Sequence, residues 1–198
     1  MIPENKRLFN QLISDEKIVD YLVRLRRHHL ETYRHSIRVG MLSIRLGHEA
    51  KMFDDLKPLG YAGLLHDIGK LRIPAGVLSK NTGLNEDEMR IIQLHPRYSL
   101  LELHNFEYPL VKKIVIAHHE FKIDPYPRSS NERRRETRVD ERRKTDINSL
   151  AQIIAVADIY DALVNARPYK PPLSISETEE IMRAQFKGKK EYVDLIFK

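Results

Sequence analysis

The chain has 198 residues, of which 41% are hydrophobic and 31% charged, with a net charge of +6 and no cysteine. This composition excludes a disordered chain and a collagen-like protein, and the missing cysteines exclude disulfides and thiolate metal ligands. No apolar run approaches the roughly 20 residues needed to cross a bilayer, and no signal peptide is visible. We therefore expect a cytoplasmic protein of one domain, residues 1–198, without membrane contact.

The elements of the first half of the chain are predicted to be helical. Apolar residues repeat along one helix face over Ile37–Ile44, and a second apolar segment covers Leu56–Gly69. Asn85 and the three acidic residues after it are typical of a helix N-cap and first turn. We expect the helix that they start to be kinked or broken near Pro96.

The second half is also predicted to be helical, apart from one loop. Pro109 is expected to begin a helix, and Ile147–Val164 is a long apolar segment without a breaker. Ser176 and Glu179 have the spacing of a capping box and predict the start of a last helical section. Because no hairpin signal occurs, we predict an all-α fold. Its expected parts are an N-terminal helical segment (1–29), a core with the candidate functional residues (30–173), a loop and basic arm inside that core (121–146) and C-terminal helices (174–198).

The basic charge is concentrated between Arg128 and Lys144, where eight basic and four acidic residues occur. A solvated arm explains this excess as well as a phosphate-binding surface does. Nucleic acid is therefore a possible but not a favoured partner. The sequence leaves the oligomeric state open.

Several histidines and aspartates stand next to or inside apolar segments. His66 and Asp67 follow two leucines, His118 and His119 follow an apolar run, and Asp158 lies within another. A buried His or Asp is costly unless it is paired or binds a metal. A satisfied core hydrogen bond explains any one of them, whereas the set together predicts a metal site between the helices of a bundle.

His35 and Glu31 extend this set, because residues four apart share one face of a helix. The other histidines lack such surroundings and are expected to be surface or core residues: His28, His29, His48 and His104.

Seven short segments occur in an order and at spacings that resemble the HD superfamily of metal-dependent phosphohydrolases, and within it the HD-GYP branch. They are Thr32–Val39, Leu65–Lys70, Ile73–Pro74, His95–Pro96, His118–Glu120, Val156–Leu163 and Arg167–Tyr169. The resemblance implies the all-α HD helical bundle with its metals near the centre.

The resemblance also implies two or three divalent metal ions. Nitrogen and carboxylate ligands without sulfur suit Fe, Mn, Zn, Ni or Co, and the family points first to iron or manganese. The implied reaction is attack on phosphorus by a hydroxide that bridges two metals. The implied ligands are His35, His66, Asp67 and Asp158 for one metal, Asp67 with His95, His118 and His119 for a second, and Glu31 for a third.

Further residues are implied around the metals. Asp67 and Lys70 are the expected catalytic residues, since Lys70 could reach a phosphate held on the metals. Arg167 and Lys170 match family positions that bind substrate phosphate, with ordinary surface charge as the alternative. Asp161 could orient Lys70 or a metal ligand from outside the metal shell, or be a surface carboxylate.

One loop departs from the branch, which is named for an Asp-Gly-x-Gly-Tyr-Pro sequence after His-His-Glu. The stretch Phe121–Pro127 keeps Tyr126 and Pro127 but lacks both glycines and is one residue shorter. Pro125 forbids backbone conformations that glycine permits, so this loop must have another shape. The departure weakens the inference about substrate and partner contacts, and the basic arm offers a replacement lid.

Three functions are therefore open. The favoured one is hydrolysis of cyclic di-GMP to linear pGpG and GMP, and the second is hydrolysis of another nucleotide or phosphoester. The third is a non-catalytic module that binds a ligand or nucleic acid. Since the motifs account for one domain only, regulation is expected to come from a protein partner, oligomerisation or substrate supply.

Overall fold

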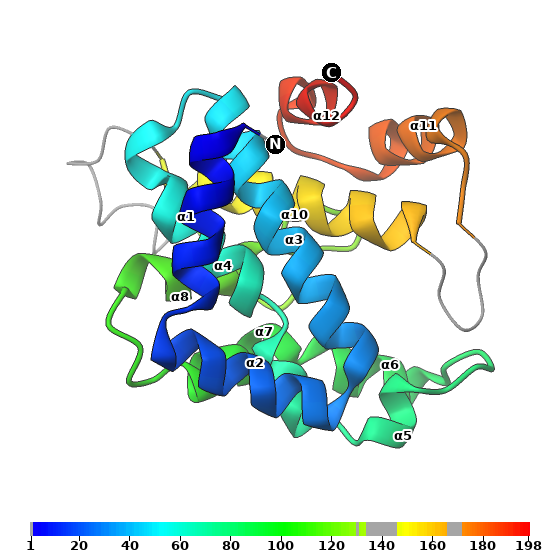
Figure 1. Cartoon of the computed structure of the whole chain (residues 1–198). Coiled ribbons are helices and arrows are strands. Elements are labelled where there is room, and N and C mark those ends of the chain that lie inside the picture. The colour runs from blue at the N-terminus through cyan, green and yellow to red at the C-terminus, as the bar shows by residue number, and fades with distance from the viewer. Residues whose placement is uncertain (1, 130, 134–145, 166–171) are drawn as a thin grey trace.

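The computed structural model describes residues 2–129, 131–133, 146–165 and 172–198, and the regular elements in these ranges are all helical. The prediction of an all-α fold is confirmed. Four helices form the centre: α3 (Leu30–Glu49), α4 (Leu56–Leu65), α8 (Pro109–Ala117) and α10 (Ile147–Val164). They contact one another in a ring, α3 with α4, α4 with α8, α8 with α10 and α10 with α3 (Figure 1).

The central helix α10 has the bounds that the sequence predicts and is buried along most of its length. The Asp146 side chain caps its first turn by accepting a hydrogen bond from the Asn148 amide. Within the described residues it is the one helix long and apolar enough to cross a membrane. Since it is the core of a helical bundle, these properties are explained by burial inside the protein.

Helices α3 and α4 approach closely where two glycines meet. A Cβ atom added at Gly63 would lie 2.8 Å from the Gly40 Cα atom, and one added at Gly40 would lie 2.8 Å from the Leu64 side chain. Small residues at the crossing let the two backbones come together. The end of α4 is thereby brought against the middle of α3, next to His35.

Short elements connect the central helices. The N-terminal segment forms α1 (Pro3–Ile13) and α2 (Glu16–His28), which pack on α3 and α4. Three 3-10 and α-helical pieces follow α3: η1 (Phe53–Asp55) before α4, then η2 (Ile68–Arg72) and α5 (Ala75–Leu78) after it.

Helices α6 (Glu86–Gln93) and α7 (His95–Glu102) confirm two sequence predictions. Asn85 and Glu88 form the capping box that starts α6. The predicted break near Pro96 is present, since α6 ends before Leu94 and Pro96 lies in the first turn of α7.

The C-terminal helices α11 (Ile175–Gln185) and α12 (Lys190–Ile196) pack on α10. The predicted capping box at Ser176 is wrong by two residues. Ser174 and Glu177 form the box, because Ser174 has the extended backbone (φ −62°, ψ 161°) of an N-cap. Glu179 instead pairs with Arg183 one turn later.

Candidate metal centre

Seven buried side chains from five parts of the chain meet at the centre of the bundle. They come from the N-terminal third of α3, the turn after α4, the start of α7, the residues after α8 and the C-terminal half of α10. The seven are His35, His66, Asp67, His95, His118, His119 and Asp158.

The placement of His66 and Asp67 differs from the expected position inside an apolar helix. Helix α4 ends at Leu65 and η2 begins at Ile68, so the pair lies in the tight turn between them. Gly69 lets η2 pack closely on the start of α7, because a Cβ atom there would lie 2.0 Å from the His95 carbonyl oxygen. The turn points both side chains at α3 and α7 instead of along one helix face.

The first group of ligand atoms combines two imidazoles with a carboxylate. The Nε2 atoms of His35 and His66 lie 3.2 Å apart, and His35 Nε2 lies 3.1 Å from Asp158 Oδ1. One atom from each of these three residues therefore lies within coordination distance of a common point.

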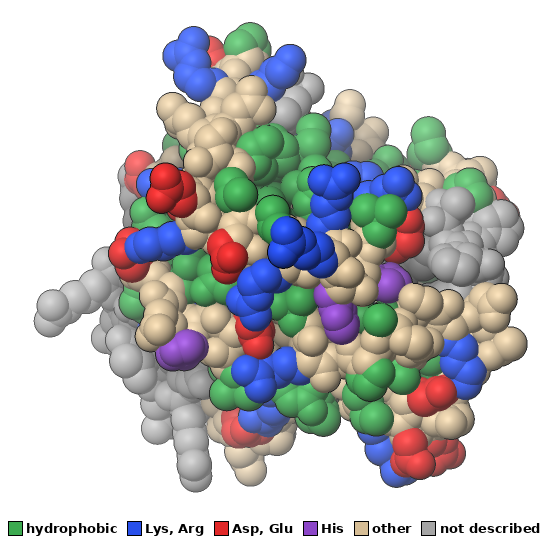
Figure 2. Space-filling model, turned by 60° about the horizontal axis from the view of Figure 1, so that its bottom comes forward, with side chains coloured by type: hydrophobic (Ala, Val, Ile, Leu, Met, Phe, Trp, Pro, Cys, Tyr) green, Lys and Arg blue, Asp and Glu red, His purple; other side chains and the backbone are tan. Residues whose placement is uncertain are grey.

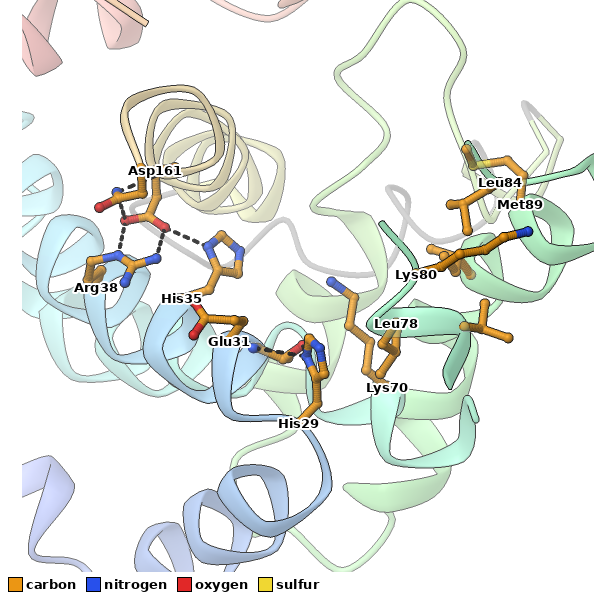
Figure 3. A pocket seen from close by; sticks show the side chains of 14 residues that line it. His29, Glu31, His35, Arg38, Lys70, Leu78, Lys80, Leu84, Met89 and Asp161 are labelled. Carbon is orange, nitrogen blue, oxygen red and sulfur yellow. Dashed lines mark hydrogen bonds and ion pairs between the residues drawn. The ribbon is translucent and has the colours of Figure 1, made fainter. Parts of the chain in front are cut away.

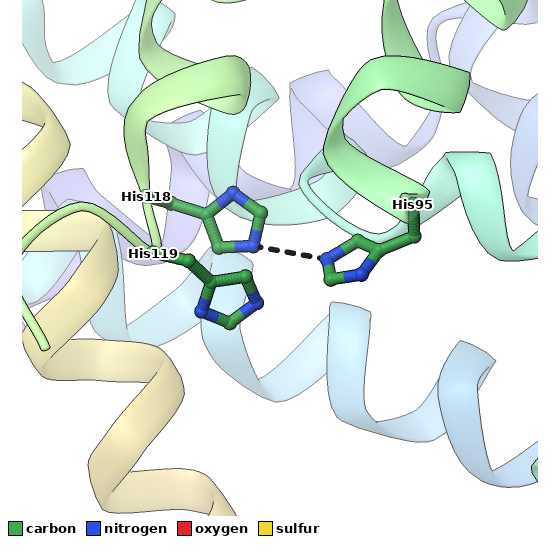
Figure 4. Close-up of side chains that lie close together, drawn as sticks. All are labelled: His95, His118 and His119. Atoms are coloured by element: carbon green, nitrogen blue, oxygen red, sulfur yellow. Dashed lines mark hydrogen bonds between the residues drawn. The ribbon is translucent and has the colours of Figure 1, made fainter. Parts of the chain in front are cut away.

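The second group consists of three imidazoles, drawn in Figure 4. The Nε2 atoms of His95 and His118 are 3.3 Å apart, and His119 stacks on His118 with a distance of 4.0 Å between the ring centroids. These rings can supply three nitrogen ligands to one ion.

Asp67 lies between the two groups. Its Oδ1 atom is 3.2 Å from His95 Nε2, while its Oδ2 atom is 3.5 Å from His66 Nε2 and 3.7 Å from His35 Nε2. The two oxygens of one carboxylate thus face different groups. This is the arrangement of a carboxylate that can bridge two cations.

The hydrogen bonds of the ring Nδ1 atoms explain why the cluster fits metal ions. Backbone carbonyls of Gly63, Ile92 and Val115 lie 2.5–2.8 Å from the Nδ1 atoms of three histidines, each three residues before the ring. A carbonyl only accepts, so each Nδ1 donates and each neutral ring keeps a lone pair on Nε2. The three rings are those of His66, His95 and His118.

The surroundings of His35 and His119 also bear on whether the cluster can hold metal ions. His35 Nδ1 donates to Asp161 Oδ2 at 2.7 Å, and its Nε2 atom faces the cluster, 3.1 Å from Asp158 Oδ1. His119 Nδ1 is buried without a hydrogen-bond partner. The Nε2 lone pairs of His95 and His118 face each other at 3.3 Å and repel unless a cation lies near them, and an orphaned buried nitrogen is costly. The residues therefore fit divalent metals.

Burial sets the charge state that metal binding needs. Removal from water lowers the pKa of His66, His118 and His119, and it lowers the pKa of His95 to about 4. These rings are therefore neutral ligands near neutral pH. His35 is the exception, because hydrogen bonds to Asp158 and Asp161 raise its pKa although burial opposes this.

The two carboxylates of the cluster stay ionised. Burial alone would raise the pKa of Asp67, but nearby Lys70 and the histidines hold it well below its usual value. Burial acts in the same way on Asp158, where the charge of Lys122 and the contacts of His35 and His119 together outweigh it and the pKa is also lowered. Lys70 Nζ is 2.6 Å from Asp67 Oδ2, and Lys122 Nζ is 3.4 Å from Asp158 Oδ2.

Asp161 contacts a candidate ligand and does not pair with Lys70. It accepts the hydrogen bond of His35 and is held by Arg38, whose Nε lies 2.6 Å from Asp161 Oδ1. Asn165 donates to the same carboxylate oxygen at 3.0 Å. This chain fixes the orientation of the His35 ring. Arg38 was not expected from the sequence, although it lies one turn after His35.

The altered loop adds two more residues that the sequence analysis missed. The Tyr126 ring lies over His119 with 4.5 Å between centroids, and Lys122 contacts Asp158. The loop is fixed by the buried pair of Arg128 and Glu120, with 2.9 Å between Arg128 Nη2 and Glu120 Oε2. The position of this loop directly after the His-His-Glu motif was the sequence signal that could have identified Tyr126 and Lys122.

Some expected site residues are not brought into the cluster. Glu31 is about half exposed and pairs with Arg34 at 2.7 Å. Arg167 and Lys170 lie outside the described residues, and so does most of the arm between Arg128 and Lys144. The histidines that were set aside are not among the ligand atoms: His28 contacts the Ile73 carbonyl, His48 packs on Phe53 and His104 is exposed. His29 caps α3 and lines the cavity beside the cluster.

A cavity of about 270 Å³ opens next to the cluster. His35 and Asp161 line one side and Lys70 reaches toward its middle from the other, as Figure 3 shows. In the space-filling view, Lys and Arg side chains gather in the middle of this face of the molecule (Figure 2). Arg38 and Lys70 line the cavity together with His35, so positive charge borders the cavity beside the candidate metal centre.

Comparison with known proteins identifies relatives of this arrangement. The HD domain family model matches residues 32–163. A Thermotoga maritima protein named cyclic di-GMP phosphodiesterase is 32% identical over 184 residues, which cover 84% of this chain and 47% of that protein. A Vibrio cholerae protein named 3'3'-cGAMP-specific phosphodiesterase 1 is 35% identical over 158 residues, covering 77% of this chain and 33% of that protein.

A third relative is also named a cyclic di-GMP phosphodiesterase, and a solved structure has a similar fold. The cyclic di-GMP phosphodiesterase response regulator RpfG of Xanthomonas campestris is 33% identical over 136 residues, covering 67% of this chain and 33% of that protein. The chain therefore spans half or less of the length of these curated relatives. The HD domain of the Listeria monocytogenes phosphodiesterase PgpH has the same fold, with a TM-score of 0.59 at 17% identity over 89% of this chain and 92% of that one.

Proposed function

The chain belongs to the HD domain family, and we propose that it is a metal-dependent phosphodiesterase that hydrolyses cyclic di-GMP. The observation that carries the proposal is the convergence of histidine Nε2 atoms on the two oxygens of Asp67. HD domains bind divalent metals, and the His and Asp clusters of this chain suit that role.

The residues that would hold the metals fall into the two groups described above. His35, His66 and Asp158 would hold one ion, His95, His118 and His119 the other, and Asp67 would contact both. Bound divalent cations supply Lewis-acid stabilisation of phosphoryl charge and lower the pKa of water. Iron or manganese is the proposed identity, and Glu31 remains the proposed ligand of a third ion.

The protein's own residues account for phosphate binding. The Lys70 ammonium is about one-fifth exposed and lines the cavity from beside Asp67, so it can neutralise a phosphate oxygen next to the cluster. Lys122 offers a second positive charge on the Asp158 side. We propose that Arg167 and Lys170 add further phosphate contacts.

Orientation of the ligands depends on a second set of contacts. Arg38 and Asp161 hold His35, while backbone carbonyls hold three other rings. A ligand set held this firmly keeps its geometry while the phosphate charge changes during the reaction.

A second substrate is supported by one observation, the likeness to a protein named 3'3'-cGAMP-specific phosphodiesterase. Both substrates are cyclic dinucleotides with 3'–5' phosphodiester bonds, so the same metal and lysine contacts suit either. Regulation by a protein partner also remains a proposal.

The test is turnover by anaerobically purified protein, with bound metals counted by elemental analysis on the same sample. Two or more metals per chain, with pGpG or GMP formed from cyclic di-GMP, would support the proposal. Full metal content with turnover of 3'3'-cGAMP alone would reassign the substrate. Full metal content without turnover of either dinucleotide would overturn the phosphodiesterase assignment.

A further inference from the structure

The wall of the cavity opposite the metal cluster is made of apolar side chains that take no part in the hydrophobic core. Val77 and Leu78 lie on α5, Leu84 lies in the loop after it, and Met89 and Ile92 lie on α6. None of the five is among the core residues or the apolar residues packed against the core. Met89 is 43% exposed.

An apolar cavity wall beside a phosphate site suits a ligand with an apolar part that covers the wall. Lys70 and the cluster bind the charged part of a substrate at one side of the cavity, and the apolar wall lies at the other side (Figure 3). A nucleotide has this combination, with a phosphate at one end and a flat, largely apolar base face at the other. Methionine in particular makes favourable contacts with aromatic rings.

One charged residue lines this wall. Lys80 borders the cavity, and its ammonium is held by Glu88, with 2.7 Å and 3.0 Å to the two carboxylate oxygens. Glu88 is itself fixed, since it accepts from the Asn85 amide in the capping box of α6. The two contacts with Glu88 use two of the three N–H donors of the ammonium, so one donor remains for a ligand, and the side chain is about one-third exposed.

We propose that the α5–α6 wall is a subsite for a guanine base and that Lys80 is its specificity-determining residue. Guanine presents two neighbouring acceptors, N7 and O6, whereas adenine presents an acceptor and an N–H₂ donor at these positions. An ammonium group only donates, so both acceptors of the guanine edge suit it, whereas at adenine N7 alone suits it and the N–H₂ group opposes it. The inference rests on the proposed nucleotide hydrolysis and specifies which base is selected.

The test measures binding of GMP and AMP to the manganese-loaded full chain by isothermal titration calorimetry. We expect the wild type to bind GMP about tenfold more tightly than AMP. Lys80→Met keeps the aliphatic stem and should abolish this preference. Lys17→Met is the matched control, since Lys17 forms an ion pair with Glu107 on an exposed surface away from the cavity.

A second pair of variants tests the apolar wall without changing charge. Met89→Gln should weaken both nucleotides about threefold. Ile91→Gln is the control, because Ile91 is 38% exposed on the same helix and does not line the cavity. Thermal unfolding of each variant checks that α6 is intact.

Equal binding of GMP and AMP by the wild type would overturn the proposal, and so would a GMP preference that survives Lys80→Met. Unchanged binding by Met89→Gln would overturn the role of the wall. A GMP preference that depends on Lys80, found without any cyclic di-GMP turnover, would support the subsite and reject the phosphodiesterase. Turnover of cyclic di-GMP without a preference for GMP over AMP would support the phosphodiesterase and reject the subsite.

Discussion

The metal cluster and the α5–α6 wall border one cavity, but the fold holds them in opposite ways. Asp67 and His66 are almost completely buried and lie among the central helices, whereas Met89 is 43% exposed on a short helix outside the core. The residues for the chemical step are therefore fixed by the same packing that stabilises the protein. Residues for substrate selection can change without disturbing that packing.

The largest effect is expected from Asp67→Ala, because Asp67 contacts both groups of ligand atoms. We expect the metal content per chain to fall and turnover of cyclic di-GMP to drop to the level without enzyme. Elemental analysis and product chromatography on the same sample measure both. The exposed carboxylate variant Asp20→Ala is the control, and a full metal content in Asp67→Ala would contradict the assignment.

Removal of the metals should make the stability of the cluster depend on pH. Burial lowers the pKa of His95 to about 4, while an unfolded histidine titrates near 6.5. Between these values the unfolded chain binds more protons than the folded chain, so the free energy of unfolding should fall as the pH decreases from 6.5 toward 4. His66, His118 and His119 act in the same direction because burial also lowers their pKa.

Urea unfolding of chelator-treated protein at several pH values measures this effect. His35 opposes it, since a raised pKa stabilises the fold at low pH and this stabilisation is lost as the pH rises. Stability that is constant or that increases toward pH 4 would show that the four buried rings are not neutral. Metal-loaded protein is the reference.

A pair of truncations separates the core from the wall. Ile154→Ala should lower the free energy of unfolding by about 2–5 kcal/mol, since Ile154 is fully buried in α10. Ile92→Ala should cost about 1 kcal/mol or less, because Ile92 lies outside the core. Chemical denaturation measures both, and equal losses would contradict the distinction between the two regions.

A partial loss of metal binding is expected from Asp161→Asn, because Asp161 contacts the cluster through His35. Loss of the charged acceptor should lower metal affinity or turnover by about 10- to 100-fold, without the complete loss expected for Asp67→Ala. Competition with a metal-binding dye measures the affinity. The exposed variant Asp194→Asn is the control, and an unchanged affinity would show that Asp161 does not orient the ring.

The sequence predicted the fold class and several helix boundaries because these depend on local patterns. Proline at residue 109, the long apolar run at Ile147–Val164 and the Asn85 cap each act within a few residues. The Ser176 box failed because two Ser-x-x-Glu patterns overlap, and Ser174 is the serine with the extended backbone of an N-cap. Local sequence alone does not choose between them.

Most candidate ligands came from the residues themselves, since a histidine or aspartate in an apolar segment signals a buried polar group that needs a partner, whereas His95 was implied only by the resemblance to the HD superfamily. The tertiary structure decided how these groups share the site: Asp67 faces both sets of histidines, and Asp161 contacts His35 and does not pair with Lys70. Only the packed chain placed Tyr126 over His119 and the α5–α6 wall beside Lys70. Such contacts join residues far apart in the chain, and their distances depend on how whole helices pack.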